Sequence, residues 1–142
     1  MLEVRMIENG IVIDHIKSGN GIKIFNKLDL LSKECPTVLL MNVASNVLGK
    51  KDIIKIENTF DVDLNLLGLI DDTISINIIR DNKVIEKKKV NLPRNVNGLI
   101  QCKNPRCITN SDIYIKPTFV LLCKDTLEYK CEFCDEITKF HI

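Results

Sequence analysis

Four cysteines in the last third of the chain constrain its fold more than any other feature. Cys102 and Cys107 bracket four residues, Cys131 and Cys134 bracket two, and 23 residues separate the pairs. Each pair can present two thiolates from one tight turn, and a tetrahedral Zn²⁺ ion needs two such pairs. The spacing therefore predicts one structural zinc ion per chain, held by four sulfur atoms.

A site of this kind is closed to chemistry. Four sulfur ligands leave no coordination position for water, so Lewis-acid hydrolysis is not expected. The alternatives are disulfides, reduced free thiols or an iron–sulfur cluster. A reducing compartment disfavours disulfides, and clusters usually need tighter cysteine runs. Lys103, Arg106 and Lys130 lie near the cysteines in sequence and would offset the negative charge of the four thiolates.

The composition sets the kind of core and the compartment. Apolar residues make up 45% of the 142 residues, but only 5% are aromatic and Trp is absent, so the core must consist mainly of Ile, Leu and Val. The start, "MLEVRMIENG", lacks the pattern of a secretory signal, and no apolar run reaches the length of a membrane span. We therefore expect a cytoplasmic protein, in which Cys35 and Cys123, each alone in the sequence, are buried structural thiols.

The first two thirds of the chain mix strand and helix patterns. Strands are expected over residues 2–7 and 11–16 with a turn at Asn9-Gly10, as a buried strand over 37–43, over 51–58, and over 73–80 and 83–90 as a hairpin around Asp81-Asn82. Helices are expected over 21–31 and over 61–70, the second with Asp61 as N-cap. This order predicts the α+β class, with an antiparallel sheet and two helices on one face in a ferredoxin-like arrangement.

A second, smaller domain is expected to follow. The stretch "NLPRNVNG", residues 91–98, is rich in Pro, Gly and Asn and is the best candidate for a linker. The piece after it is too small to close an adequate core without a cross-link, which the zinc ion would supply. We predict domains over 1–92 and 93–142, the second a small all-β, zinc-ribbon-like domain.

No catalytic grouping stands out in the first domain. The two histidines, His15 and His141, lie at opposite ends of the chain, and there is no GxSxG, P-loop or HExxH motif. Two lysine groups do stand out, Lys50, Lys51 and Lys55 in one and Lys87, Lys88 and Lys89 in the other. A solvated sheet face or edge is the simple explanation of such lysines, and an anionic ligand is the alternative.

Several separated motifs together resemble one family. "GIVIDHI" (10–16), "GKKDIIKIEN" (49–58), "LP" (92–93), "CKNPRCI" and "CEFC" occur in the order and spacing of the regulatory chain of aspartate carbamoyltransferase. The resemblance covers nearly the whole chain. It implies a non-catalytic subunit of pyrimidine biosynthesis whose first domain binds CTP, ATP and often UTP, and whose zinc domain docks on the catalytic chain. In that family, regulatory chains pair as dimers in an assembly with catalytic trimers.

The resemblance also implies a nucleotide site. Carried over by position, it comprises Val4, Met6, Ile7, Val12, Asp14, Ile53, Lys55, Asn77, Ile79, Val84 and Lys87, with His15 beside it. Several of these residues are two apart in an expected strand, which places their side chains on one face. Lys87 would meet the triphosphate, Lys55 the ribose or phosphate, and Asp14 the ribose hydroxyls, while backbone near Met6, Ile7 and Ile79 would contact the base.

Some positions depart from the pattern of the family. Asn46 replaces a frequent Gly, Asn82 or Lys83 stands where an aromatic residue can flank the base, and the leader is short, so effector preference stays open.

In the zinc domain, Asn104, Arg106 and Asp135 lie beside the cysteines, and the resemblance places that edge against the catalytic chain.

Two other functions compete with the regulatory one. A nucleic-acid-binding zinc ribbon would need a basic surface, but six basic side chains in 98–142 are matched by six acidic ones, and the net charge of the chain is only +1. A redox or hydrolytic metalloenzyme would need an open coordination position, which four cysteines do not leave. Retention on heparin would favour the first of these, and turnover by the isolated chain the second.

Overall fold

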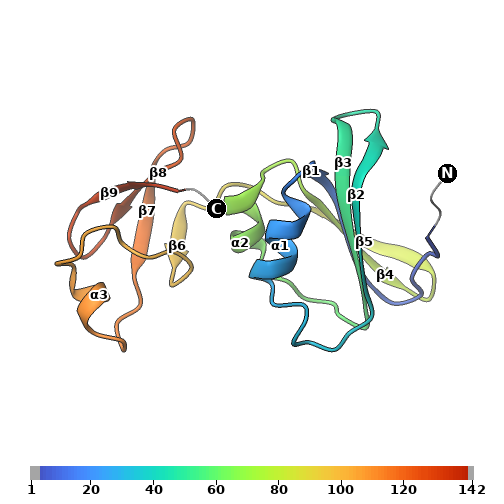
Figure 1. The fold of residues 1–142 in the computed structure, drawn as a ribbon, viewed down its shortest axis with the longest axis horizontal. Coiled ribbons are helices and arrows are strands. Elements are labelled where there is room, and N and C mark those ends of the chain that lie inside the picture. The colour runs from blue at the N-terminus through green and yellow to red at the C-terminus, as the bar shows by residue number, and fades with distance from the viewer. Residues whose placement is uncertain (1–3, 141–142) are drawn as a thin grey trace. The chain divides into compact units, whose positions relative to one another are not determined.

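The computed structural model describes residues 4–140, which divide into two compact units with the boundary between Asn91 and Leu92. Figure 1 shows the course of the chain through both units. No helix within the described residues is long and apolar enough to cross a membrane. Each unit is described by itself below.

The first unit is a five-stranded antiparallel sheet with two helices. Its strand order is β2-β3-β1-β4-β5. The strands are β1 (Gly10–Lys17), β2 (Thr37–Ser45), β3 (Gly49–Glu57), β4 (Ser75–Arg80) and β5 (Lys83–Lys89). The helices α1 (Gly21–Lys27) and α2 (Leu64–Ile70) both lie against one face of the sheet (Figure 1). The α+β class and the placement of two helices on one face are confirmed.

Alternation of apolar residues explains which face the helices cover. Ile11 and Ile13 of β1 and Ile54 and Ile56 of β3 are at most 1% exposed, whereas the residues between them are half-buried. In a strand, residues two apart point to the same face, so these isoleucines form one apolar surface. Burying each against the helices contributes about 1.5–3 kcal/mol, and Ile24 of α1 is fully buried with them.

The expected first strand and its hairpin turn are wrong. Residues 4–7 form no strand, residues 2 and 3 lie outside the described residues, and Gly10 opens β1 instead of making a turn. Gly10 has a φ of +147°, and a Cβ atom there would lie 2.1 Å from the carbonyl oxygen of Ile56. The glycine is therefore needed because two backbones approach closely, and not for a hairpin turn.

Other element boundaries shift for local reasons. The helix expected over 21–31 ends at Lys27, and residues 28–33 continue as turns in which Asp29 has a φ of 52°. The second helix begins at Leu64, because the side chain of Asp63, and not Asp61, accepts hydrogen bonds from the N–H groups of Asn65 and Leu66 at 3.0 and 3.1 Å.

The strand expected to be buried is an edge strand. β2 lies at one end of the sheet and all of its residues are half-buried or exposed, with Met41 56% exposed. An apolar run alone cannot distinguish a central strand from an edge strand. The hairpin around Asp81 and Asn82 is confirmed, and their φ values of 51° and 65° are those of a tight turn between antiparallel strands.

The second unit is a small antiparallel sheet with strand order β6-β7-β8-β9. The strands are β6 (Asn95–Asn97), β7 (Thr118–Cys123), β8 (Glu128–Cys131) and β9 (Ile137–Lys139), and α3 (Ile108–Ser111) is a single turn. Part of the expected linker is therefore strand, since β6 pairs with β7. Val96, Phe119 and Tyr129 are fully buried, and this core is small. The small all-β second domain is confirmed.

Candidate metal centre and ligand-binding face

The four cysteines lie in loops or at the ends of secondary-structure elements in two separate segments of the second unit. Cys102 lies in the loop after β6, and Cys107 is the N-cap residue of α3. Cys131 ends β8, and Cys134 lies in the turn between β8 and β9. The fold brings together two segments more than twenty residues apart, as the sequence predicts.

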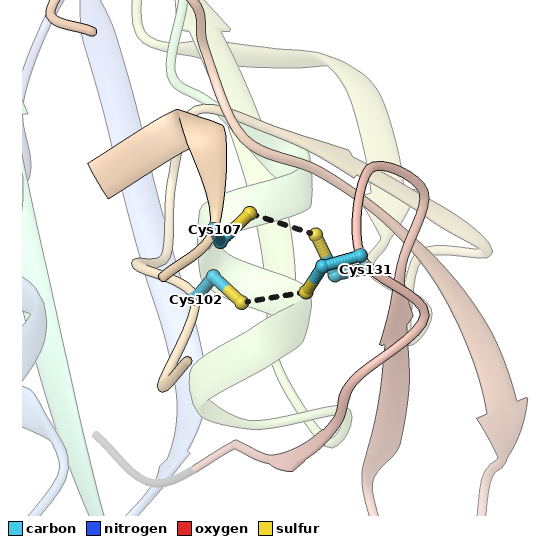
Figure 2. A group of neighbouring side chains, drawn as sticks. Cys102, Cys107 and Cys131 are labelled. Atoms are coloured by element: carbon cyan, nitrogen blue, oxygen red, sulfur yellow. Dashed lines mark hydrogen bonds between the residues drawn. The ribbon is translucent and has the colours of Figure 1, made fainter. Parts of the chain in front are cut away.

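The sulfur atoms have the spacing of a metal site. All four lie within 4.8 Å of one another. The Sγ atoms of Cys102 and Cys134 are 3.5 Å apart, those of Cys107 and Cys131 are 3.7 Å apart, and Figure 2 shows the sulfurs of Cys102, Cys107 and Cys131 converging. Zn–S bonds of about 2.3 Å in a tetrahedron place sulfurs roughly 3.8 Å apart, whereas a disulfide needs about 2.05 Å. The four cysteines therefore fit one structural zinc ion per chain and not two disulfides.

The thiols differ in how readily they lose a proton in the metal-free chain. Burial raises the pKa of Cys102 to about 12 and also raises the pKa of Cys131. A hydrogen bond from the hydroxyl of Thr109 lowers the pKa of Cys107 to about 7. Since zinc binds thiolates, the ion must displace protons from the buried thiols. When bound, zinc supplies a cross-link between the two segments and no open position for a reaction.

The two lysines beside the cysteines are paired with carboxylates at the surface. Lys103 lies 3.6 Å from Glu136, and Lys130 lies 3.4 Å from Asp135. These lysines, expected to offset the thiolates, are thus shared with carboxylates. Both pairs are largely exposed, so each contributes little to stability.

The uncovered face of the first unit carries a row of side chains across all five strands. Lys55 lies opposite Val38 on one side and Val12 on the other, Val12 opposite Asn77, and Asn77 opposite Lys87. Facing residues share a face, and this row alternates with the buried isoleucines. We call this surface, opposite the two helices, the open face.

Two hollows lie on the open face, each large enough for a ligand. The first, here called the leader hollow because residues 4–8 before β1 (the leader) line it, has a volume of about 520 Å³. The second, here called the lysine hollow, has a volume of about 530 Å³. Both volumes lie within the roughly 300–1,000 Å³ typical of ligand sites. The leader hollow is lined by Val4, Arg5, Met6, Ile7, Glu8, Pro36, Thr37, Val38, Lys55 and Glu57. The lysine hollow is lined by His15, Val47, Leu48, Thr73, Ser75, Asn77, Lys87, Lys88 and Lys89.

The structure brings the expected nucleotide residues onto this one face. Seven of them line a hollow: Val4, Met6, Ile7 and Lys55 line the leader hollow, and His15, Asn77 and Lys87 line the lysine hollow. Val12 lies between the hollows in the central row, and Ile53 and Asp14 lie two residues from Lys55 and Val12 on the same face. Ile79 and Val84 face each other near the β4–β5 turn.

The two hollows differ in charge. The lysine hollow has three lysines and no carboxylate among its lining residues, whereas the leader hollow combines Arg5 and Lys55 with Glu8 and Glu57. A polyanion such as a triphosphate therefore fits the lysine hollow better.

Asp14 and His15 are held in place by their neighbours. One carboxylate oxygen of Asp14 accepts the backbone N–H of His15 at 2.6 Å and lies 3.0 Å from Nζ of Lys51. His15 has a φ of 57° at an irregularity in β1, and its Nδ1 lies 2.8 Å from Oγ of Ser75. This network fixes the orientation of the histidine ring at the edge of the lysine hollow.

Sequence reasoning missed several lining residues. Ser75 lies two residues before Asn77 and so shares its face, a periodicity that could have identified it. Val47 and Leu48 come from the turn between β2 and β3, and Arg5 comes from the irregular leader. No sequence pattern indicates that these residues approach the sheet.

Comparisons with known proteins agree over the whole chain. Residues 2–91 match the family model described as "Aspartate carbamoyltransferase regulatory chain, allosteric domain", and residues 94–142 match that described as "metal binding domain" of the same chain. The aspartate carbamoyltransferase regulatory chain of Clostridium tetani is 57% identical over 140 residues, which cover 98% of this chain and 97% of the relative. That of Clostridium acetobutylicum is 52% identical over 98% and 95%, and that of Bifidobacterium longum is 41% identical over 97% and 99%.

Proposed function

The chain belongs to the family of aspartate carbamoyltransferase regulatory chains, and on this premise we propose that it binds nucleotide effectors and transmits their effect to a catalytic chain. It is a non-catalytic subunit, since its relatives are regulatory chains and its two domains match an allosteric and a metal-binding model. The effectors are CTP and ATP, with UTP a third candidate. The first domain, 1–92, binds them, and the second, 93–142, docks on the partner.

The row of side chains across the open face is the observation that carries the nucleotide proposal. Lys55, Val12, Asn77 and Lys87 lie side by side, with a hollow at each end of the row. The triphosphate occupies the lysine hollow, where Lys87 is exposed and free to move toward it. The base lies toward the leader hollow near Met6 and Ile7, and the ribose spans the centre, where Asp14 accepts hydrogen bonds from its hydroxyls.

The metal-binding domain is proposed as the docking module. Cys102, Cys107, Cys131 and Cys134 hold the zinc ion, which fixes the two cysteine loops against each other. Asn104, Arg106 and Asp135 lie on those loops; Arg106 and Asp135 are exposed, and Asn104 is half-buried. A rigid edge of this kind suits a permanent contact with the catalytic chain. We further propose that the chain pairs as a dimer and that the assembly is cytoplasmic. Coupling between nucleotide and partner needs only about 1–3 kcal/mol.

Calorimetric titration of CTP and ATP tests the nucleotide site. Lys87→Ala removes one cation from the lysine hollow, and we expect it to weaken binding roughly tenfold, as loss of one charge-assisted hydrogen bond would. Lys27→Ala is the matched control, because Lys27 is an exposed lysine of α1, on the covered side of the sheet and outside both hollows. Unchanged affinity in Lys87→Ala would show that the triphosphate does not bind in the lysine hollow.

A further inference from the structure

The two cysteine pairs are held by different means. Cys131 ends a sheet strand, its N–H donates to the carbonyl of Glu136 at 2.9 Å, and its carbonyl accepts the N–H of Asp135 at 2.9 Å. Backbone hydrogen bonds and the pairing of β8 with β9 therefore close the loop that carries Cys131 and Cys134. This second pair is shaped by the sheet itself.

The first pair lies outside the sheet and is held largely by side chains. One backbone bond, from the N–H of Cys107 to the carbonyl of Asn104 at 3.0 Å, spans its loop. The side-chain amide of Asn110 donates to the carbonyls of Cys102 and Asn104 at 2.9 and 2.6 Å. Gln101 in turn donates to the amide oxygen of Asn110 at 3.0 Å, which fixes the direction of the two donated bonds.

A second side chain reaches a ligand atom directly. The hydroxyl of Thr109 lies 3.1 Å from the sulfur of Cys107. A thiolate can only accept a hydrogen bond, so in the metal-bound state the hydroxyl must be the donor. Thr109 is half-buried, which limits the access of water that could replace this donor.

We infer that Thr109 and Asn110 are positioning residues for the metal, holding the loop of Cys102 and Cys107 in its ligating shape. This rests on the proposed four-cysteine ligand set. Asn110 fixes the backbone that carries both sulfurs, and Thr109 stabilises and orients the Cys107 thiolate. Partners of metal ligands commonly change metal affinity by roughly 10–100-fold when removed. Loss of either side chain should therefore weaken metal binding at Cys102 and Cys107 first.

Metal release from the full-length chain tests the inference. Zinc transfer to a coloured chelator is timed for the wild type, Thr109→Val and Asn110→Ala, and cobalt-loaded forms give the sulfur-to-metal absorption bands. Thr109→Ser keeps the hydroxyl and should restore wild-type behaviour. Ser111→Ala is the matched control, because it removes a hydroxyl from the same helical turn that bonds only to the carbonyl of Ile108 among the described contacts.

We expect zinc release to be roughly tenfold faster in Thr109→Val and Asn110→Ala, and within twofold of wild type in the two controls. Thr109→Val should also shift the sulfur-to-cobalt band, since the thiolate loses a donor, and this isosteric change leaves packing intact. Wild-type release rates and an unshifted band in Thr109→Val would overturn the inference. Absence of the sulfur-to-cobalt band in the wild type would overturn the four-cysteine site itself, and the inference with it.

Discussion

At the scale of single residues, a few polar side chains determine how the first unit is built. Asp52 is fully buried, and its carboxylate accepts the N–H groups of Gly19, Gly21 and Asn42, each at 3.0 Å. It thereby joins the β1–α1 connection to the edge strand β2. Gly21 must be glycine there, since a Cβ atom would lie 2.7 Å from the Cβ of Asp52.

Asp52→Ala should destabilise the chain strongly. Three N–H groups would lose their acceptor. That of Gly21 is buried and would be left without a partner, which costs about 1–3 kcal/mol, whereas Gly19 and Asn42 are exposed residues whose N–H groups can bind water. We expect the free energy of unfolding to fall by about 1–3 kcal/mol in urea titrations. Asp72→Ala is the control, because Asp72 is exposed, and it should change stability by less than about 0.5 kcal/mol. Equal small effects in both variants would contradict a structural role for Asp52.

At the scale of elements, the alternation of apolar residues predicted which face of a strand is buried, because neighbouring residues determine that. It did not predict which strands lie side by side, because that depends on segments far apart in the sequence. Ile11 and Ile13, like Ile54 and Ile56, are predictable as the covered face because their spacing of two fixes a common direction. The leader around Val4–Ile7 reads as a strand by the same rule but pairs with none, because β1 already has β3 and β4 as neighbours. Whether β2 lies inside or at an edge depends likewise on which strand comes beside it.

The candidate sites show the same division. The cysteine pairs are recognisable from spacing alone, because each pair belongs to one loop. The lysine hollow needed the register of β1, β4 and β5, together with Val47 from a turn far away in sequence, and no local pattern encodes that contact. The role of Thr109 and Asn110 likewise could not be predicted from the sequence, since it depends on the direction of single hydrogen bonds.

Strand β8 offers a test of the second core through Tyr129. This residue is fully buried, its hydroxyl donates to the carbonyl of Pro93 at 2.6 Å, and burial raises its pKa to about 12. The unfolded chain has a tyrosine pKa of about 10, so the folded state binds the proton more tightly. Its contribution to stability is therefore fully present below pH 10 and is lost as pH rises from about 10 to 12.

Absorbance of tyrosinate measures this directly. The chain has two tyrosines, so a Tyr114→Phe background leaves Tyr129 as the reporter. We expect ionisation only above about pH 11 while the chain stays folded. A transition near pH 10 with circular dichroism unchanged would show that the hydroxyl is accessible to water, contrary to the structure.

At the scale of the whole molecule, the two units depend on different sources of stability. The first unit buries an extensive aliphatic core of Ile and Leu residues, whereas the second has few large buried side chains and four cysteines that fit one zinc ion. Below roughly 70–80 residues a domain commonly needs a metal or other cross-link. The metal-binding unit should therefore depend on its ion, and the allosteric unit should not.

Removal of zinc should unfold one unit selectively. Chelation should increase the rate of backbone hydrogen exchange in β7 and β8, since the free energy of metal binding is free energy of folding there. The amides of β1 and β3 should stay protected, because their core contains no metal ligand. Exchange measured by mass spectrometry on the full chain distinguishes the two units. Protection that persists in β7 and β8 after the metal is gone would contradict a structural role for the ion.

Reconstitution with a catalytic trimer tests the central claim, that this chain carries a nucleotide signal to a catalytic partner. The zinc-loaded chain is mixed with the trimer, and the mass of the complex and its carbamoyltransferase activity are measured with and without CTP and ATP. The account predicts a larger complex whose activity responds to at least one nucleotide, and a weaker response to that nucleotide when Lys87→Ala replaces the wild type. A trimer that stays free of the zinc-loaded chain, or a complex whose activity is the same with and without both nucleotides, would contradict it.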